Sequence, residues 1–472
     1  MPDSIGFHQD AKILVKGMKD YGFGIWRLTP TGCGTACYDE MVAVTALIYY
    51  FTFPHPIFML IFNALLQSIV VFVFFKILIK ITKNKKISFL SSSIFLIFPS
   101  QFLFISQIQR DGIFSLGIIV YLYLIVNFFD QLNKNKINYI LEYIKIIILT
   151  LLILLSISTS RHYYIQILIM FVCFIFIIQT LYYIFYFNKK FNIYIFLQPV
   201  LVLVSIFFFS FFLEFNYMKQ HSYLYYLFQK TLNINLYSVE DKADLVYLEI
   251  KETEIKRAEV VSKTNSVNKD VVVSEPSNLK TKFEHTITIT DYEKYNILEG
   301  NKSFKEIRYT NWIKFDWIPS IIDNKIKGLA FSRLGFLSVT GNTNIDNDVV
   351  FKNSLDVFNY MPRALQIGLY SPFPKFIFNN KDYNFSKKLL TIVFLESIFA
   401  IIITVLFLFY FKKIYFKIEN FILINFCLSN IIIFCLAVNN IGTIVRMRYI
   451  FFSFILCLII SNLLVLNKKF KN

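Results

Sequence analysis

Long apolar runs alternate with short polar connections along most of the chain. Most of these runs hold about 18 or more apolar-rich positions, which is enough for a helix to cross the hydrocarbon core of a membrane. The pattern therefore predicts an all-α polytopic membrane protein with about nine transmembrane helices. The predicted spans are residues 56–81, 88–105, 112–130, 138–158, 163–187, 193–214, 389–411, 419–438 and 447–467.

The spans divide the chain into four parts. Residues 1–55 form a first outer loop with short helical patterns. Six spans follow in 56–214, and three more lie in 389–472, which ends in a short cytoplasmic tail. Residues 215–388 form a large outer segment between the two groups of spans.

The large outer segment changes character along its length. Residues 240–310 are rich in Lys, Glu, Asn, Ser and Thr, which favours a solvated, partly disordered insert. The alternation Thr286–Thr290 leaves short strands as an alternative. Residues after 311 look more ordered, and Trp312 and Trp317 indicate contact with a membrane interface.

Clusters of lysine occur at every second connection between the spans. Cytoplasmic loops carry an excess of Lys and Arg, so all these clusters are expected on the cytoplasmic side. With nine spans and an inner C-terminus, Met1 falls outside, and we expect a tenth, leading span before Pro2 in the intact protein. The clusters are Lys83–Lys86, Lys134–Lys136, Lys189–Lys190, Lys412–Lys413 and Lys468–Lys469.

Composition agrees with this interpretation. The 472 residues are 56% hydrophobic, with a mean hydropathy of +0.55. The net charge of +17 comes largely from the lysine clusters at helix ends, and no nucleic-acid-binding motif is present. The composition therefore favours a membrane protein over a nucleic-acid-binding one.

The six cysteines fall into two groups. Cys33 and Cys37 lie together in the first outer loop, where an oxidising compartment permits a disulfide. Their spacing is awkward for that bond, so a disulfide and two free thiols remain open alternatives. The other four cysteines lie in apolar runs and are interpreted as small core residues.

Arginine and histidine gather on the predicted outer side, where positive charge is not needed for topology. Arginine suits phosphate oxygens because its planar fork donates two parallel hydrogen bonds. The alternatives are snorkelling to lipid headgroups and an internal ion pair such as Arg110 with Asp111. The candidate substrate-binding residues are His8, Arg110, Asp111, Arg161, His162, Arg446 and Arg448.

Three outer carboxylates are candidate catalytic groups: Asp3, Asp39 and Glu40. Each precedes or opens a short helical pattern, so helix capping is the simplest alternative. A carboxylate in this place could instead act as the base for an acceptor nucleophile or ligate a divalent metal ion. The sequence leaves the presence of a metal or other cofactor open.

These motifs together resemble the membrane glycosyltransferases of the GT-C superfamily, including the protein O-mannosyltransferase-like and aminoarabinose transferase-like enzymes. The resemblance covers mainly residues 1–130, with a looser match at Arg446–Tyr449. It implies a polyprenyl-phosphate-linked sugar as donor and a catalytic carboxylate in the first outer loop, here Asp3, with Asp39 or Glu40 as a second acidic group. The motifs are Pro2-Asp3-Ser4 with His8 and Ala11, Leu47-Ile48-Tyr49 with Pro56 and Asn63-Ala64-Leu65-Leu66, and Phe98-Pro99-Ser100 with Arg110-Asp111.

The sequence is therefore interpreted as a glycosyltransferase of the cytoplasmic (inner) membrane of a bacterium, with its large loop outside. Its partners would be the lipid-linked sugar donor and a lipid, glycan or protein acceptor, in polysaccharide biosynthesis or other cell-envelope glycosylation. One alternative is an oligosaccharide polymerase or ligase, which uses a similar donor without requiring an acidic base. Another is a transporter or flippase for lipid-linked sugars, which would usually place polar residues near the bilayer midplane.

The alternation of lysine clusters makes the topology testable. Reporter fusions after Lys86, Lys136, Lys190 and Lys413 are expected to read cytoplasmic, because each follows a lysine-rich connection. Fusions within 240–310 are expected to read external. A cytoplasmic signal from 240–310 would contradict the predicted orientation.

Overall fold

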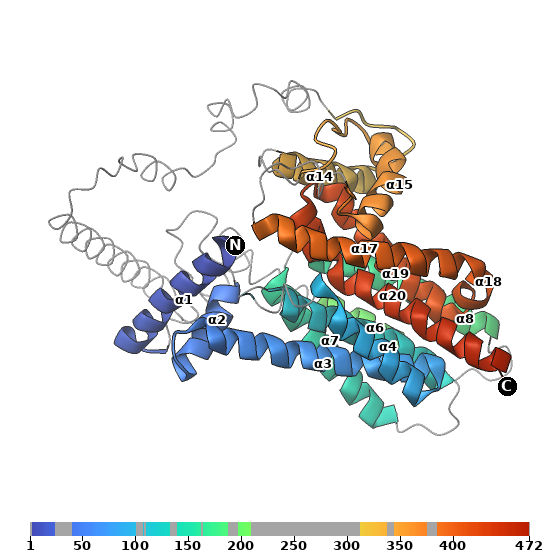
Figure 1. Cartoon of the computed structure of the whole chain (residues 1–472), viewed down its shortest axis with the longest axis horizontal. Helices are drawn as coiled ribbons and strands as arrows, with labels where there is room; N and C mark the ends of the chain where they lie inside the picture. The colour runs from blue at the N-terminus through green and yellow to red at the C-terminus, as the bar shows by residue number, and fades with distance from the viewer. Residues whose placement is uncertain are drawn as a thin grey trace. The chain divides into compact units, whose positions relative to one another are not determined.

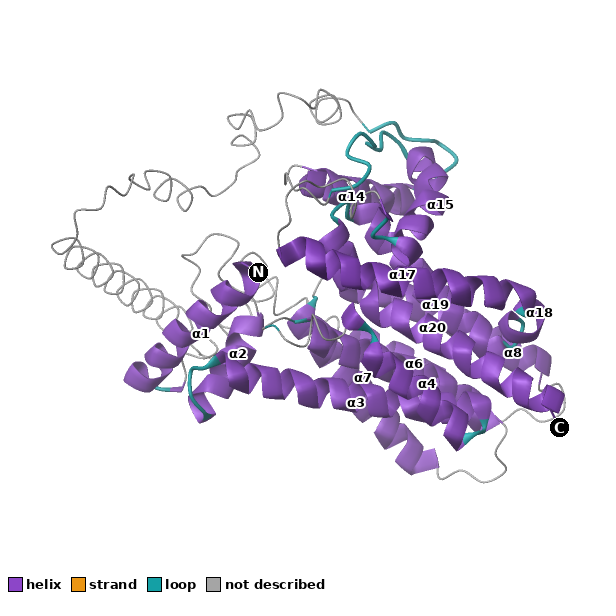
Figure 2. Cartoon of the chain, in the orientation of Figure 1, coloured by secondary structure: helices purple, strands orange, loops and turns teal. Residues whose placement is uncertain are grey.

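The computed structural model describes residues 2–23, 40–100, 107, 110–132, 139–161, 164–186, 197–208, 312–337, 344–374 and 385–471. Within these ranges the chain is mostly helical, and its β pairings are two isolated bridges (Figure 2). The all-α prediction is confirmed for this part of the chain. The strands considered for 240–310 lie outside the described residues.

The helices follow the predicted apolar runs in order (Figure 1). A further apolar helix, which carries no label, covers Leu197–Phe208 within the predicted span 193–214. The labelled helices are α1 (Pro2–Tyr21), α2 (Glu40–Phe51), α3 (Pro56–Thr82), α4 (Lys85–Ile97), α6 (Asp111–Leu132), α7 (Tyr139–Ser160), α8 (Tyr164–Tyr186), α14 (Ser320–Leu337), α15 (Ser354–Tyr370), α17 (Phe385–Phe409), α18 (Phe411–Tyr415), α19 (Ile418–Ala437) and α20 (Ile441–Lys471).

Six described helices are long and apolar enough to cross a membrane. They belong to α3, α6, α7, α17, α19 and α20, so the chain is a multi-pass membrane protein. The other three predicted spans coincide with α4, α8 and the 197–208 helix. The count of nine spans, the leading tenth span and the orientation stay predictions.

Helix α4 is shorter than the apolar run that predicts it. It ends at Ile97, and Phe98 adopts extended backbone with φ −60° and ψ 121°. Proline disfavours helical backbone in the residue before it, so Pro99 accounts for this end. The apolar run 88–105 is therefore interrupted at Phe98–Pro99.

The chain forms two compact units, which are described separately. The first comprises residues 1–64, 107–110 and 210–296. Within it α1 packs against α2 through one apolar face. That face recurs at helical spacing, which is why this part of the sequence forms an amphipathic helix. Its buried residues are Phe7, Ala11, Leu14, Val15 and Met18.

The second unit comprises residues 65–106, 111–209 and 297–472. Helix α6 packs along α7, while α19 packs against α20 and α15. In the apolar part of α6, 89% of the residues are buried, against 33% in α3 and 33% in α7. Helix α6 is therefore a core helix, whereas α3 and α7 keep large apolar surfaces for lipid.

Helices α14 and α15 lie in the segment before α17 and are tied to α19 by a buried arginine. Arg333 of α14 donates from Nε to the carbonyl of Val349 (3.2 Å) and from Nη2 to that of Asp346 (3.1 Å). Its Nη1 reaches the carbonyl of Cys435 on α19 at 3.5 Å. The guanidinium thus joins a loop and two helices through backbone acceptors.

A salt bridge supports the same loop. Arg363 donates from Nε to Asp346 Oδ2 (2.9 Å), and Tyr360 donates its hydroxyl to the same oxygen (2.7 Å). Burial alone would raise the pKa of Asp346, but hydrogen bonds from Arg363 and Tyr360, with the charges of Arg363 and Arg333, lower it overall. The carboxylate therefore stabilises this loop in its charged form.

Gly368 marks the closest approach of α15 to α19. A Cβ atom at this position would overlap Cγ2 of Ile431 and lie 3.1 Å from Sγ of Cys435. Overpacking of this kind usually costs about 1–3 kcal/mol. We expect Gly368→Ala to lower the unfolding temperature of the purified protein, measured by thermal denaturation in detergent.

Gly328→Ala on α14 is the matched control, because nothing lies within 4 Å of the added Cβ. It is expected to leave stability unchanged or raise it by about 0.5–1 kcal/mol, the difference in helix propensity. Equal unfolding temperatures for the two variants would contradict the close packing of α15 on α19.

Candidate functional site

The start of α6 carries a buried carboxylate. Asp111 is the first residue of the helix, where a negative charge is favoured by the helix dipole, and its side chain is 1% exposed. Arg161 directly follows the last residue of α7, and Arg446 lies near the start of α20. The start of α6, the end of α7 and the start of α20 therefore meet at one end of the helices.

Both oxygens of this carboxylate bind guanidinium groups. Arg161 donates from Nη2 to Oδ1 of Asp111, and Arg446 donates from Nε to Oδ2 at 2.5 Å. The Arg161 side chain is 5% exposed and that of Arg446 is 18% exposed. One carboxylate thus pairs with two guanidinium groups at this end of the helices.

Aromatic and hydroxyl groups hold this cluster in place. The guanidinium carbon of Arg161 lies 5.3 Å from the centre of the Phe114 ring, within the range of a cation–π interaction. Ser115 Oγ donates to the backbone carbonyl of Asp111 at 2.7 Å, and the Tyr449 hydroxyl donates to the same oxygen at 2.9 Å. These bonds fix the first turn of α6 against α20.

Arg110 belongs to the first unit, where it lies beside α1. Its guanidinium carbon is 5.9 Å from the Phe7 ring. The next residue along α1, His8, shares a hydrogen bond of 2.8 Å between its Nδ1 and the Tyr49 hydroxyl. Burial, and then the charges of Lys12 and His55, lower the pKa of His8. The structure thus associates Arg110 with α1, the helix that also carries His8.

Arg448 has a different environment from the other candidate arginines. It is 1% exposed and bonds to the end of α15. Its Nη1 donates to the carbonyls of Ile367 (3.1 Å) and Gly368 (2.5 Å), and its Nη2 donates to the carbonyl of Ser371. Since these partners are protein backbone, Arg448 holds α15 against α20, and its predicted contact with substrate stays untested.

The remaining predicted site residues are described only in part. Asp3 lies in the first turn of α1 and Glu40 is the first residue of α2, where the helix dipole favours an acidic residue, although the structure describes neither side chain. Asp39 and His162 lie outside the described residues, as do Cys33 and Cys37. The structure therefore brings Asp111, Arg161 and Arg446 together and leaves the catalytic roles of the first-loop carboxylates open.

Sequence analysis missed a buried carboxylate within one of the predicted spans. Glu396 on α17 is 3% exposed, and its Oε1 accepts a hydrogen bond of 2.5 Å from the backbone N–H of Ser100. A carboxylate inside an apolar run is costly unless it has partners, and that rule would have identified it. It satisfies the backbone just after the Pro99 break, so it has a structural role.

Within the described ranges, no three His, Cys, Asp or Glu side chains gather as metal ligands would. The four cysteines of the apolar runs are free thiols, and three of them are buried. The idea of a divalent metal at the first-loop carboxylates stays a prediction.

No protein-family model, no curated protein and no solved structure matches this chain. The fold and the site together define a class only, which is a helical multi-pass membrane protein with a buried Asp–Arg cluster at one end of its helices.

The charge balance of this cluster can be tested by mutation. Asp111→Asn would leave two guanidinium groups without their carboxylate, and removing one partner of a buried ion pair typically costs about 3–5 kcal/mol. We expect a large fall in thermal stability in detergent. The double variant Asp111→Asn with Arg161→Gln should recover part of the loss, because it removes one of the two cations that have lost the Asp111 carboxylate.

Asp346→Asn provides a comparison at a more exposed ion pair, in which the Asp346 and Arg363 side chains are 18% and 39% exposed. Its loss of stability should be clearly smaller than that of Asp111→Asn. Equal losses, or no recovery in the double variant, would show that the cluster does not stabilise the fold as described.

Proposed function

We propose that this protein is a membrane glycosyltransferase that uses a polyprenyl-phosphate-linked sugar at the outer face of the cytoplasmic membrane. The observation that supports this proposal best is the cluster of Asp111, Arg161 and Arg446, in which one carboxylate orients two guanidinium groups at the end of three helices. A lipid phosphate lies at such a boundary, between the apolar core and water.

The cluster suits a phosphate group in charge and in geometry. Arg446 binds Asp111 through Nε, and its side chain is 18% exposed against 5% for Arg161, so Arg446 is the arginine nearer the surface. Asp111 would act as a positioning residue that orients both guanidinium groups. In the transition state these groups would stabilise the negative charge that develops on the departing lipid phosphate.

Asp111 is poorly placed to act as the base. Both of its carboxylate oxygens accept hydrogen bonds from guanidinium groups, which favours its charged form and opposes proton uptake. The proposed base is therefore Asp3, with Asp39 or Glu40 as a second acidic group. The acceptor hydroxyl would lose its proton to Asp3 as its oxygen bonds to the anomeric carbon, and the bond from that carbon to the phosphate oxygen would break.

The same observation supports a second candidate, an oligosaccharide polymerase or ligase. Such an enzyme needs the arginines for its lipid-phosphate donor but can act without an acidic base. In the arginine cluster, the carboxylate of Asp111 forms ion pairs with two arginines. This arrangement is compatible with an enzyme that does not use a carboxylate as its base. The two candidates therefore differ in their dependence on Asp3.

The deciding variant is Asp3→Asn, because an amide keeps the shape of the side chain but does not take up the proton. General-base catalysis contributes about 100-fold or more, so we expect at least that loss in the rate of sugar transfer with normal protein levels. The assay is transfer from a polyprenyl-phosphate sugar in membranes that carry each variant.

Asp20→Asn is the matched control, since Asp20 is also an aspartate of α1 but lies in its last turn. Transfer by this variant should equal that of the unchanged protein. Full activity of Asp3→Asn would reject the acid–base role and favour the polymerase or ligase. Absence of transfer from any polyprenyl-phosphate sugar by the unchanged protein would reject both candidates.

A further inference from the structure

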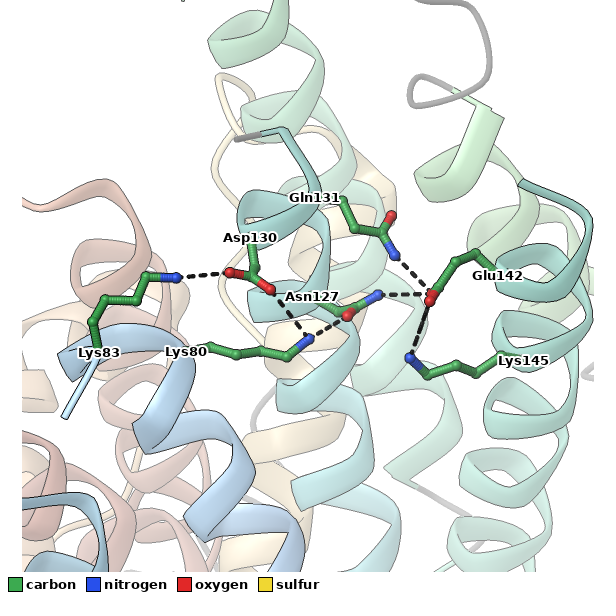
Figure 3. Close-up of polar contacts among 7 residues, drawn as sticks. All are labelled: Lys80, Lys83, Asn127, Asp130, Gln131, Glu142 and Lys145. Atoms are coloured by element: carbon green, nitrogen blue, oxygen red, sulfur yellow. Dashed lines mark hydrogen bonds and ion pairs between the residues drawn. The ribbon is translucent and has the colours of Figure 1, made fainter. Parts of the chain in front are cut away.

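A second charged network lies at the other end of α6 (Figure 3). Asp130 is separated from Asp111 by about 28 Å along the helix axis, close to the thickness of a hydrocarbon core, which is about 30 Å. The network joins the end of α3, the end of α6 and the start of α7. Its residues are Lys80, Lys83, Asn127, Asp130, Gln131, Glu142 and Lys145.

One half of this network connects α3 to α6. Lys83 Nζ lies 2.7 Å from Asp130 Oδ1, and Lys80 Nζ lies 3.7 Å from Oδ2 of the same carboxylate. Lys80 also donates to Oδ1 of Asn127. The two lysines therefore share one aspartate, and Lys80 alone also binds an amide.

The other half connects α6 to α7. Gln131 donates from Nε2 to Glu142 Oε2 at 2.7 Å, and Asn127 donates from Nδ2 to the same oxygen at 3.4 Å. Lys145 Nζ lies 3.4 Å from that oxygen. Glu142 is thus engaged by two amides, while its contact with Lys145 is long and weak.

Two ammonium groups from different helices approach one aromatic ring. Lys80 Nζ lies 4.6 Å from the centre of the Tyr123 ring, and Lys145 Nζ lies 5.4 Å from it. Bringing like charges together raises their energy, and a shared anion would lower it. This convergence is the feature that indicates a ligand.

The network carries more positive than negative charge. Its three lysines face two carboxylates, and the exposed Lys85 and Lys86 add two more charges at the start of α4. The lysines of the network also differ in depth. Their side chains are 17% exposed at Lys80, 36% at Lys145 and 65% at Lys83. An anion would therefore meet ammonium groups from the interior out to the surface.

Apolar side chains flank the network on the lipid-facing helices. Ile140 and Leu141, beside Glu142 on α7, are 72% and 63% exposed, and Ile144 is 50% exposed. On α3, Phe72 is 58% exposed. A free inorganic anion would gain nothing from these surfaces, whereas the acyl chains of a lipid would cover them.

We propose that this network binds the phosphate headgroup of an anionic phospholipid, whose chains lie along the exposed faces of α3 and α7. Lys145 and Lys83 are the headgroup contacts, and Lys80 with Tyr123 forms the inner wall of the site. Basic sites between transmembrane helices commonly bind anionic lipids in this way. The site lies at the opposite end of α6 from Asp111, and its occupancy does not depend on the proposed transferase activity.

Lipid titration tests the proposal. The purified full-length protein in detergent is titrated with phosphatidylglycerol, with phosphatidylcholine or with inorganic phosphate, and bound lipid is counted by native mass spectrometry. Phosphatidylglycerol is expected to bind most tightly. Each of Lys145→Gln and Lys83→Gln should weaken it about fivefold, the effect of one lysine charge near a lipid headgroup.

Two further variants separate binding from a purely structural role. Lys412→Gln removes an exposed lysine from α18, which packs against α17, α19 and α20, and should change phosphatidylglycerol affinity less than about twofold. Glu142→Gln removes a competing negative charge and should tighten binding, although it weakens an interhelical contact.

Several outcomes would overturn the proposal. Unchanged affinity in both network lysine variants, equal losses in all three lysine variants, or weaker binding in Glu142→Gln would each show that the network is structural only. Displacement of phosphatidylglycerol by an equal concentration of inorganic phosphate would assign the site to a free anion. Equal affinity for phosphatidylcholine would show that the headgroup charge is not recognised.

Discussion

The structure depends on the burial of α6 among its neighbours. Because α6 is surrounded by other helices, the charged side chains at its two ends cannot extend to lipid headgroups. They therefore need partners within the protein. Asp111 has two arginines at the start of the helix, and Asp130 has two lysines near its end. These ion pairs attach α3, α7 and α20 to α6 and so set which helix ends meet.

Two other buried arginines, Arg333 and Arg448, bind the protein backbone. Arg333 and Arg448 donate to backbone carbonyls of loops and helix ends rather than to a nearby carboxylate. A guanidinium has five donors in a rigid fork and can therefore satisfy several carbonyls at once. These two arginines connect the segment of α14 and α15 to α19 and α20. Arginine on one side of a membrane protein is thus not by itself a sign of a ligand.

The helices were largely predictable because length and hydropathy are local properties of a sequence. Each apolar run contains a helix, and the end of α4 follows from Pro99 through the backbone of Phe98. The sequence predicts nine spans, whereas six described helices are long and apolar enough to cross a membrane. The described parts of the other three runs are too short to test the higher count.

The site was predictable only in part. Grouping charges by membrane side correctly placed Asp111, Arg161 and Arg446 together, since helix direction fixes which end of each helix they occupy. The same reasoning could not tell that Arg448 binds backbone, because its partners depend on how α15 packs. Nor could it show that both arginines bond directly to the Asp111 carboxylate, since contacts between residues 50 and 335 positions apart depend on tertiary packing.

The distance between the two charged ends of α6 also sets a requirement on the surrounding bilayer. A single helix adapts to a thicker or thinner membrane by tilting. Helix α6 is held at one end by Arg161 and Arg446 and at the other by Lys80 and Lys83, so it can tilt only if its neighbours tilt with it. In a bilayer of mismatched thickness, the lipids around α3 and α7 must deform instead. Hydrophobic mismatch therefore acts on the whole group of helices. Both ion clusters stay intact most easily in a bilayer whose hydrocarbon thickness matches the distance between them.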